Sequence, residues 1–238
     1  MFGEQERVIE MNDGLSEYVT KVFLWMFAGL MITGVVAYTT WVTNLYTIFF
    51  ANMAMLLILF LVEIGLVVYI SSRISKGAIS GKGATIGFVA YSIVNGFVLS
   101  SLFITFGIGT LYQAFFMTSI TFGAMAIYGH VTKKDLTKFG TIMIAGLIGI
   151  IIATLVNAIF GLFGAYSTGL DLVISYIAII IFLGLTAWDT QKIKAYYYGT
   201  MGNEGTKNNL VIYSALQLYL DFINLFLYIL RIFAARRD

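Results

Sequence analysis

The chain has 238 residues, of which 60% are hydrophobic and only 11% are charged. This composition excludes a soluble domain, which would need far more polar surface, so the solvent of the chain is lipid. The net charge of +2 gives no reason to expect a nucleic-acid partner, and the absence of cysteine excludes disulfides and thiolate metal sites.

Seven apolar segments follow one another along the chain, each near the length of about 20 residues that a membrane-spanning helix needs. We expect helices over residues 22–42, 45–72, 84–106, 111–131, 139–163, 172–197 and 210–232. The polar residues before the first segment lack the basic start of a signal peptide, so this segment is a retained helix. The links are short except for the polar segment Gly199–Asn209, which we expect to be a loop. The sequence predicts one all-α polytopic membrane domain over residues 1–238.

Lysine and arginine alternate between the two sides of the predicted membrane. They precede the first helix and follow or end the second, fourth and sixth, whereas the links after the first, third and fifth contain none. By the positive-inside rule, we expect a multi-pass protein of the cell (plasma) membrane with a cytoplasmic N-terminus. The seventh segment departs from this rule, because Arg231, Arg236 and Arg237 follow it. It either spans against its local charge or enters and returns; we expect it to span, since its length suffices.

Three acidic residues lie inside apolar segments, where an ionised side chain costs several kcal/mol and usually faces the protein interior. They are Glu63, Asp189 and Asp221, on the second, sixth and seventh predicted helices. Counted from the cytoplasmic helix ends at about 1.5 Å per residue, all three lie roughly 11 to 16 Å deep. The sequence therefore predicts three carboxyl groups at one level of the bilayer.

The seventh predicted helix carries a polar stripe on one face. Its members are spaced by three or four residues, which places them above one another on a helix: Ser214, Gln217, Asp221, Asn224 and Tyr228. We expect this face to line or support a polar, water-filled path. Hydrogen bonding between helices is the alternative interpretation.

Two neighbouring carboxyl groups in a low dielectric share one proton and titrate as a unit. Such a pair, formed by Asp189 and Asp221, would sense pH and would offer oxygen ligands for transient Ca²⁺ binding. A nearby arginine could hold the ionised form and release it on protonation, and Arg73 is the best candidate for this latch. Simpler roles remain open: Asp189 could merely pair with Lys192, and Arg73 could be a positive-inside anchor.

No catalytic residue or resident cofactor is expected. The sequence has no phosphate-binding loop, no His-Glu-x-x-His motif and no nucleophile elbow.

Two stretches carry a family resemblance: residues 186–191, Thr-Ala-Trp-Asp-Thr-Gln, and residues 215–226, Ala-Leu-Gln-Leu-Tyr-Leu-Asp-Phe-Ile-Asn-Leu-Phe. They resemble the end of the transmembrane Bax inhibitor motif (Bax inhibitor-1-like) family, and the segment from Glu63 to Arg73 is similar to its second helix. The resemblance implies a bacterial-type member with a central seventh helix surrounded by two three-helix layers. It also implies that Asp189 and Asp221 sense pH, that Arg73 latches one of them, and that Glu63 is the family's acidic position on helix two.

The resulting hypothesis is a pH-sensitive calcium-leak channel gated by the aspartate pair, with Ca²⁺ and H⁺ as its ions and the lipid bilayer as its surroundings. One alternative is a membrane regulator of a protease or of a cell-survival or stress pathway, which transports nothing and acts through a membrane protein partner. A second alternative is a proton-coupled cation transporter.

Overall fold

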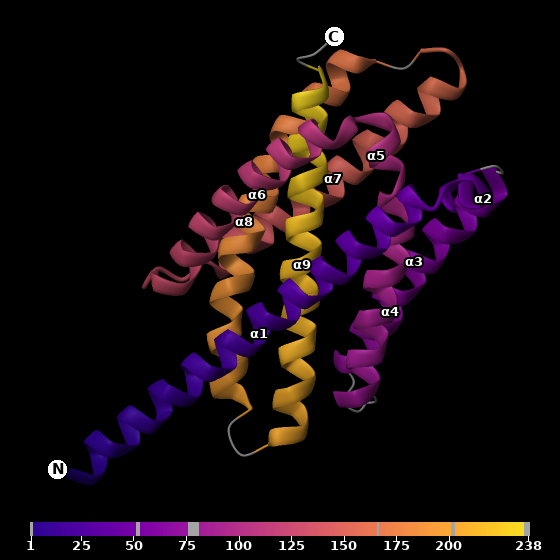
Figure 1. Cartoon of the computed structure of the whole chain (residues 1–238). Coiled ribbons are helices and arrows are strands. Elements are labelled where there is room, and N and C mark those ends of the chain that lie inside the picture. The colour runs from indigo at the N-terminus through magenta and orange to yellow at the C-terminus, as the bar shows by residue number, and fades with distance from the viewer. Residues whose placement is uncertain (1, 51–52, 76–80, 166, 201–202, 236–238) are drawn as a thin grey trace. The chain divides into compact units, whose positions relative to one another are not determined.

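The computed structural model of the chain describes residues 2–50, 53–75, 81–165, 167–200 and 203–235. Every regular element in this part is an α-helix (Figure 1), which confirms the predicted all-α class. The sequence favours this outcome because it contains no proline, so no helix has to break for want of a backbone N–H. The helices are α1 (Phe2–Val42), α2 (Tyr46–Phe50), α3 (Met53–Ser75), α4 (Gly81–Leu99), α5 (Ser101–Thr105), α6 (Gly107–Val131), α7 (Thr137–Leu162), α8 (Thr168–Gly199) and α9 (Glu204–Ala235).

Each of the seven expected spans corresponds to one or two of these helices. The fourth, fifth and sixth expected spans match α6, α7 and α8 to within four residues at each end. The first is longer than expected, because α1 continues through the polar residues before Val22. The second is divided between α2 and α3, and the third between α4 and α5, which meet at Ser100.

The prediction of a loop over Gly199–Asn209 is wrong for the second half of that segment, because α9 begins at Glu204. Asn203 explains the early start: its Oδ1 accepts a hydrogen bond from the backbone N–H of Thr206 at 3.0 Å. This is the contact by which an asparagine caps a helix N-terminus, and it allows the polar residues that follow to form the first turns of α9.

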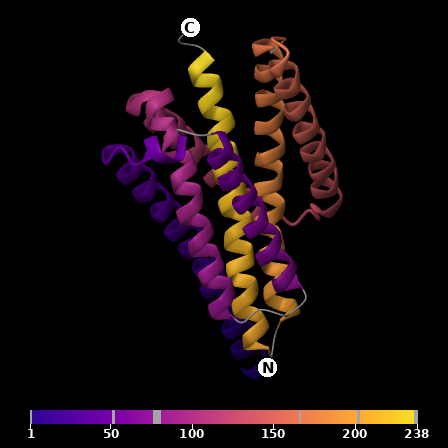
Figure 2. The ribbon, with the colours of Figure 1, turned by 90° about the vertical axis from the view of Figure 1, so that its right-hand side faces the viewer.

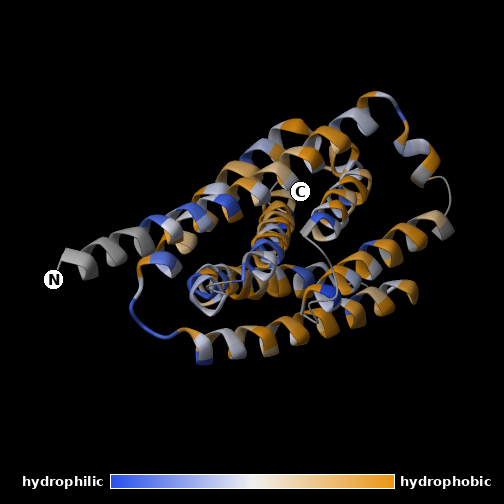
Figure 3. Cartoon of the chain, turned by 90° about the horizontal axis from the view of Figure 1, so that it is seen from below, coloured by the Kyte–Doolittle hydropathy of each residue, from blue (hydrophilic) through white to orange (hydrophobic). Residues whose placement is uncertain are grey.

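Six stretches of helix among the described residues are long and apolar enough to cross a membrane. They are residues 13–42, 82–105, 107–131, 137–162, 168–199 and 205–235. Hydrophobic residues run along most of the length of the helices (Figure 3). In the most apolar 18-residue stretch of α7 only 11% is buried inside the protein, against 50% in that of α8. Helix α7 therefore presents more of its surface to lipid than α8 does. The chain is therefore a multi-pass membrane protein.

The chain forms two compact units, and helices α8 and α9 contribute to both. The first unit contains residues 1–105 and 193–219. Within it α4 packs against α1 and α3, and α3 and α4 run alongside each other in Figures 1 and 2. Gly96 of α4 makes the contact with α1 close, since a Cβ there would lie 2.7 Å from the Cβ of Val36.

The second unit contains residues 106–192 and 220–238. Its helices α6 and α7 approach α8 closely through glycines. A Cβ on Gly129 of α6 would collide with the backbone of Ala187, and a Cβ on Gly140 of α7 would collide with the Trp188 ring. Both contacts fix the part of α8 that carries Asp189. In Figure 2, α7 and α8 lie side by side.

The turn between α7 and α8 is defined by hydrogen bonds at the end of α7. Gly164 has a φ of +76°, and the N–H groups of Gly164 and Ala165 donate to the carbonyls of Gly161 and Phe160 at 3.0 and 2.9 Å. This is the Schellman motif, which needs glycine because side chains disfavour a positive φ. Ser167 then caps α8, its Oγ accepting from the N–H of Leu170 at 3.2 Å.

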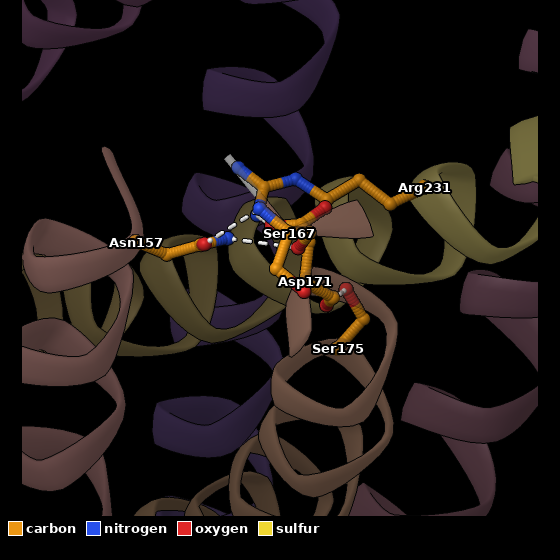
Figure 4. A network of polar contacts seen from close by, with 5 residues as sticks. All are labelled: Asn157, Ser167, Asp171, Ser175 and Arg231. Carbon is orange, nitrogen blue, oxygen red and sulfur yellow. Dashed lines mark hydrogen bonds and ion pairs between the residues drawn. The ribbon is translucent and has the colours of Figure 1, made fainter. Parts of the chain in front are cut away.

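Polar side chains tie this turn to the end of α9 (Figure 4). The amide of Asn157, which is 1% exposed, accepts from the N–H of Ser167 at 3.1 Å and donates to its carbonyl at 3.2 Å. Asp171, in the first turn of α8, forms an ion pair of 3.2 Å with Arg231 of α9. The pair therefore fastens the beginning of α8 to the end of α9.

Candidate proton and cation site

Asp189 of α8 and Asp221 of α9 meet inside the second unit. Asp189 is 8% exposed and Asp221 is 5% exposed, and the two carboxyl groups lie close enough to interact electrostatically. Two carboxyl groups that interact in a low dielectric titrate as a unit. The two residues predicted from separate helices are thus both buried, and their action as a proton-sharing pair stays a prediction.

Lys192 completes the charge balance of this site. Its Nζ lies 2.5 Å from Oδ1 of Asp189 and 3.9 Å from the centre of the Trp188 ring. The simple pairing of Asp189 with Lys192 is therefore present, together with the contact to Asp221. One ammonium faces two carboxyl groups, so the site is neutral when the pair holds one proton.

The residues around Asp189 each have a structural task. Trp188 fills the space beside Gly140, and Thr190 bonds the carbonyl of Thr186 within α8 at 2.7 Å. Gln191 accepts from the N–H of Leu136 at 2.9 Å and donates to the carbonyl of Lys134 at 2.7 Å. The side chain of Gln191 therefore holds the link between α6 and α7 against α8, two residues from Asp189.

Asp221 is positioned by the residue that follows it. The Phe222 ring lies 5.5 Å from that of Phe115 and 5.4 Å from that of Phe122, both on α6. These edge-on contacts set the rotation of α9 about its axis. The second carboxyl oxygen of Asp221, Oδ2, is buried and has no hydrogen-bond partner among the described residues.

The other residues of the predicted stripe belong to both units. Asn224 donates to the carbonyl of Leu220 at 2.8 Å, and the Tyr228 ring stacks on Phe182 with centres 6.0 Å apart. Ser214 and Gln217 belong to the first unit, where Ser214 is 2% exposed and its Oγ has no partner among the described residues. A role of these side chains in lining a path stays a prediction.

The two remaining predicted residues, Arg73 and Glu63, lie on α3 in the first unit. Arg73 is exposed at the end of the helix, with its guanidinium 5.6 Å from the centre of the Tyr69 ring. Glu63 is half-buried and accepts a hydrogen bond from Asn95. The latch role of Arg73 and the presence of Glu63 on the path of the aspartates stay predictions.

The sequence interpretation missed the positioning roles of Trp188 and Gln191, and it treated Lys192 only as a trivial partner. The sequence contained a signal for these roles, because all three residues are polar or amphipathic and lie at the end of an otherwise apolar helix. Their spacing of three and four residues also indicates shared helix faces.

The site offers carboxyl oxygens to a cation but no enclosed set of ligands. No group of three or more acidic, cysteine or histidine side chains that could hold a metal ion occurs among the residues that the structure describes. Transient Ca²⁺ binding by Asp189 and Asp221 stays a prediction, and such an ion would need further oxygens from water or backbone.

These features define a multi-pass helical membrane protein with a buried acidic pair on its last two helices. Residues 15–238 match the family described as "Inhibitor of apoptosis-promoting Bax1". The chain belongs to this Bax inhibitor-1-like family, as the two motif stretches predicted.

Similar bacterial proteins cover nearly the whole chain. It is 39% identical over 240 residues to the inner membrane protein YbhL of Escherichia coli (strain K12), covering 99% of each chain. It is 41% identical over 236 residues to an uncharacterised protein of Borreliella burgdorferi, covering 99% of this chain and 97% of the other. An uncharacterised protein of Rickettsia prowazekii is 40% identical over 228 residues, or 95% of this chain and 93% of the other.

Proposed function

We propose that the protein is a pH-sensitive calcium leak of the cell membrane, gated by the proton that Asp189 and Asp221 share. The observation that carries the proposal is the burial of two interacting carboxyl groups on α8 and α9, with Lys192 in an ion pair with Asp189. A structural role alone gives no reason for two acids to face each other in lipid, where each uncompensated charge costs several kcal/mol.

Each proton that the pair gains or loses changes the charge of this site by one unit. With one proton, the carboxylate of Asp189 and the ammonium of Lys192 balance, and the two carboxyl groups share that proton. With a second proton Asp189 no longer holds Lys192. With none, two neighbouring carboxylates repel each other and attract a cation. Small pH changes therefore alter both the contact between α8 and α9 and the affinity for Ca²⁺.

In the gating scheme, the closed state holds Asp189 ionised, paired with a cationic side chain. Lys192 supplies that cation in the structure, and Arg73 is the second candidate, as the latch that the family resemblance implies. Acidification protonates Asp189, releases the cation and opens the path, so the leak increases as the pH falls. Glu63, Ser214, Gln217, Asn224 and Tyr228 would line or support the path. Ca²⁺ then flows down its gradient, with the N-terminus of the protein in the cytoplasm.

The test is Ca²⁺ flux into proteoliposomes that contain the purified full chain and a fluorescent Ca²⁺ indicator. We expect flux that rises on acidification in the wild type and that loses its pH dependence in Asp189→Asn and in Asp221→Asn. Asp135→Asn is the matched control, because it removes an exposed carboxylate from the link between α6 and α7. It should leave the pH profile unchanged.

The same assay separates the alternatives. Absence of Ca²⁺ flux at every pH would contradict the leak and favour a regulator that transports nothing. Saturable flux with stoichiometric movement of protons in the opposite direction would favour a proton-coupled transporter. Flux with the wild-type pH profile in both aspartate variants would reject the aspartate pair as the sensor.

A further inference from the structure

A further carboxyl group inside an apolar helix, the half-buried Glu63 of α3, has its own polar surroundings within the first unit. The amide nitrogen of Asn95, on α4, donates to Oε1 of Glu63 at 2.9 Å. The same nitrogen reaches the hydroxyl of Tyr91, one turn earlier on α4, at 3.4 Å. Carboxyl, amide and phenol thus meet between two helices that pack against each other.

Of the two polar atoms in the Asn95 amide, only the nitrogen has hydrogen-bond partners among the described residues. Asn95 is 6% exposed, and its Oδ1 is buried without a hydrogen-bond partner among the described residues. A buried amide oxygen with no donor costs free energy, so a state that supplies a donor is favoured. An amide presents its oxygen where its nitrogen was after a half-turn of the group. In that orientation Oδ1 would face Glu63 and Tyr91, and a protonated Glu63 or the Tyr91 hydroxyl could donate to it.

The surroundings of Glu63 favour binding a proton over keeping a charge. Glu63 has no ion pair among the residues described here. The titratable groups that face it are the phenols of Tyr91 on α4 and Tyr219 on α9, which are neutral at ordinary pH. An ionised carboxyl group inside an apolar helix, without a cation beside it, is unstable relative to its protonated form.

We propose that Glu63, Asn95 and Tyr91 form a proton-binding site of the first unit, in which the Asn95 amide turns when Glu63 gains or loses its proton. The separation of 2.9 Å between the Glu63 oxygen and the amide suits one shared hydrogen in either state. When Glu63 is ionised, the amide donates to it; when Glu63 is protonated, the carboxyl group donates to the amide oxygen. The ligand of this site is H⁺.

Tyr219 connects this site to α9. Its ring meets the Tyr91 ring edge-on, with centres 5.7 Å apart, and its hydroxyl lies 2.6 Å from that of Thr33 on α1. The hydroxyl of Thr33 donates its hydrogen to the carbonyl of Ser92 at 2.9 Å. In the contact between the two hydroxyls, Tyr219 is therefore the donor and Thr33 the acceptor. A turn of the Asn95 amide changes the hydrogen bonding of Tyr91, which rests against this anchored ring.

The experiment is an infrared titration of the full chain in lipid nanodiscs, in the Asp189→Asn, Asp221→Asn double variant. This background removes the aspartate pair, so the result does not depend on the proposed calcium function. We expect the C=O band of a protonated carboxylic acid to be present at low pH, to shift in D₂O and to disappear as the pH rises. Adding Glu63→Gln should remove the band, while adding Asp171→Asn should leave it.

Changes around Glu63 separate proton binding from simple packing. Asn95→Leu removes the donor to the ionised form and should move the titration midpoint to higher pH by on the order of one unit, which is tenfold in proton affinity. Tyr91→Phe, a milder variant, should shift the amide band of Asn95 and keep the Glu63 band. A band that survives Glu63→Gln, or the absence of any titrating band, would overturn the proposal. So would a band that disappears on adding Ca²⁺ at constant low pH, because the site would then take a metal ion.

Discussion

At the scale of single residues, Lys192 is the side chain that gives the acidic pair its charge balance. The ammonium lies 2.5 Å from Asp189, and both side chains are largely buried, which limits screening by water. A neighbouring cation favours the ionised form of a carboxyl group, so removing Lys192 would leave the charge of Asp189 without its partner.

Replacing Lys192 by methionine should therefore move the pH dependence of Ca²⁺ flux toward higher pH. An opposite charge at this distance changes the titration of a carboxyl group by about one to three units, so the leak should open that much earlier on acidification. The measurement is the flux midpoint in proteoliposomes. Lys192→Arg keeps the charge and is the control, and a midpoint equal to that of the wild type in Lys192→Met would contradict this role.

Asp135 is a second residue whose charge matters, and it lies outside the spans in the link before α7. Hydrogen bonds from the side chain and backbone N–H of Thr137, at 2.6 and 2.9 Å, lower the pKa of Asp135 below its ordinary value. A carboxyl group with a lowered pKa in the folded state stabilises that state above its unfolded pKa. The stabilisation disappears as the pH falls through the folded value.

Asp135→Ala should therefore lower the melting temperature at neutral pH, and the difference from the wild type should close below about pH 4. The measurement is thermal unfolding in detergent micelles at a series of pH values. Thr137→Val removes one of the two donors and should have the same sign with a smaller effect. A difference that is independent of pH would mean that the carboxylate charge is irrelevant to this turn.

At the scale of helices, close approaches at glycine position the segment of α8 that carries Asp189. A methyl group on Gly140 would enter the Trp188 ring, and one on Gly129 would enter the backbone of Ala187. Overpacking of this kind costs about 1 to 3 kcal/mol.

Gly140→Ala and Gly129→Ala should each lower the free energy of unfolding by that amount and disturb the pH dependence of flux. The chain offers a matched control on each helix, because a methyl group on Gly149 of α7 or Gly123 of α6 would contact nothing within 4 Å. Gly149→Ala and Gly123→Ala should match the wild type or exceed it slightly. Equal effects at all four positions would show that α8 is not held by these contacts.

The ion pair between Asp171 and Arg231 joins the start of α8 to the end of α9. Arg231 is one of the arginines at the end of the last expected span that depart from the positive-inside rule. Arg231 is 38% exposed at its side chain and Asp171 is 19% exposed, so the pair contributes about 1 kcal/mol or less to stability. Its larger consequence concerns charge, because pairing neutralises the arginine at the end of the last span. A carboxylate near the start of α8 also faces the positive end of that helix.

Exchanging the two residues, with Asp171→Arg and Arg231→Asp together, should recover part of the stability that each single change loses. A double-mutant cycle of unfolding in micelles measures this coupling. Additive effects of the two single changes would mean that the ion pair contributes no coupling energy.

At the scale of the whole molecule, the sequence predicted the class of the protein and its family. Among the described residues, six of the seven expected spans correspond to helices long and apolar enough to cross a membrane, and several helix ends were misplaced. Apolar length alone identified α6, α7 and α8, because crossing the bilayer requires it. The start of α9 was misplaced, because polar residues between Gly199 and Asn209 resemble a loop until the cap from Asn203 is known. Within the second unit, counting depth brought Asp189 and Asp221 together, since position along a helix is readable from sequence.

Contacts between helices were much less accessible from sequence. Nothing in the local pattern indicates that Asn95 meets Glu63, or that Gln191 binds the link between α6 and α7. Such partners depend on the rotation and crossing of helices, which are set by many packing contacts at once. The short i to i+3 contact between Asp189 and Lys192 was predictable because it is local.

The membrane topology is also a property of the whole chain. We expect the N-terminus in the cytoplasm and the end of α9 on the opposite side, since α9 is one continuous helix of 32 residues. The natural chain has no cysteine, so single cysteines report position without background. In intact cells an impermeant thiol reagent should label Ala235→Cys and spare Asp13→Cys, and the reverse pattern, or labelling of neither, would contradict this topology.

The most direct test of the account is whether Asp189 and Asp221 act on Ca²⁺ flux as one proton-binding unit. Flux should be measured across pH for the wild type, Asp189→Asn, Asp221→Asn and the double variant, all reconstituted at equal density. A shared proton predicts that each single change abolishes the pH dependence and that the double variant behaves like either one. Two single variants that each keep a separate titration, with effects that add in the double variant, would contradict it.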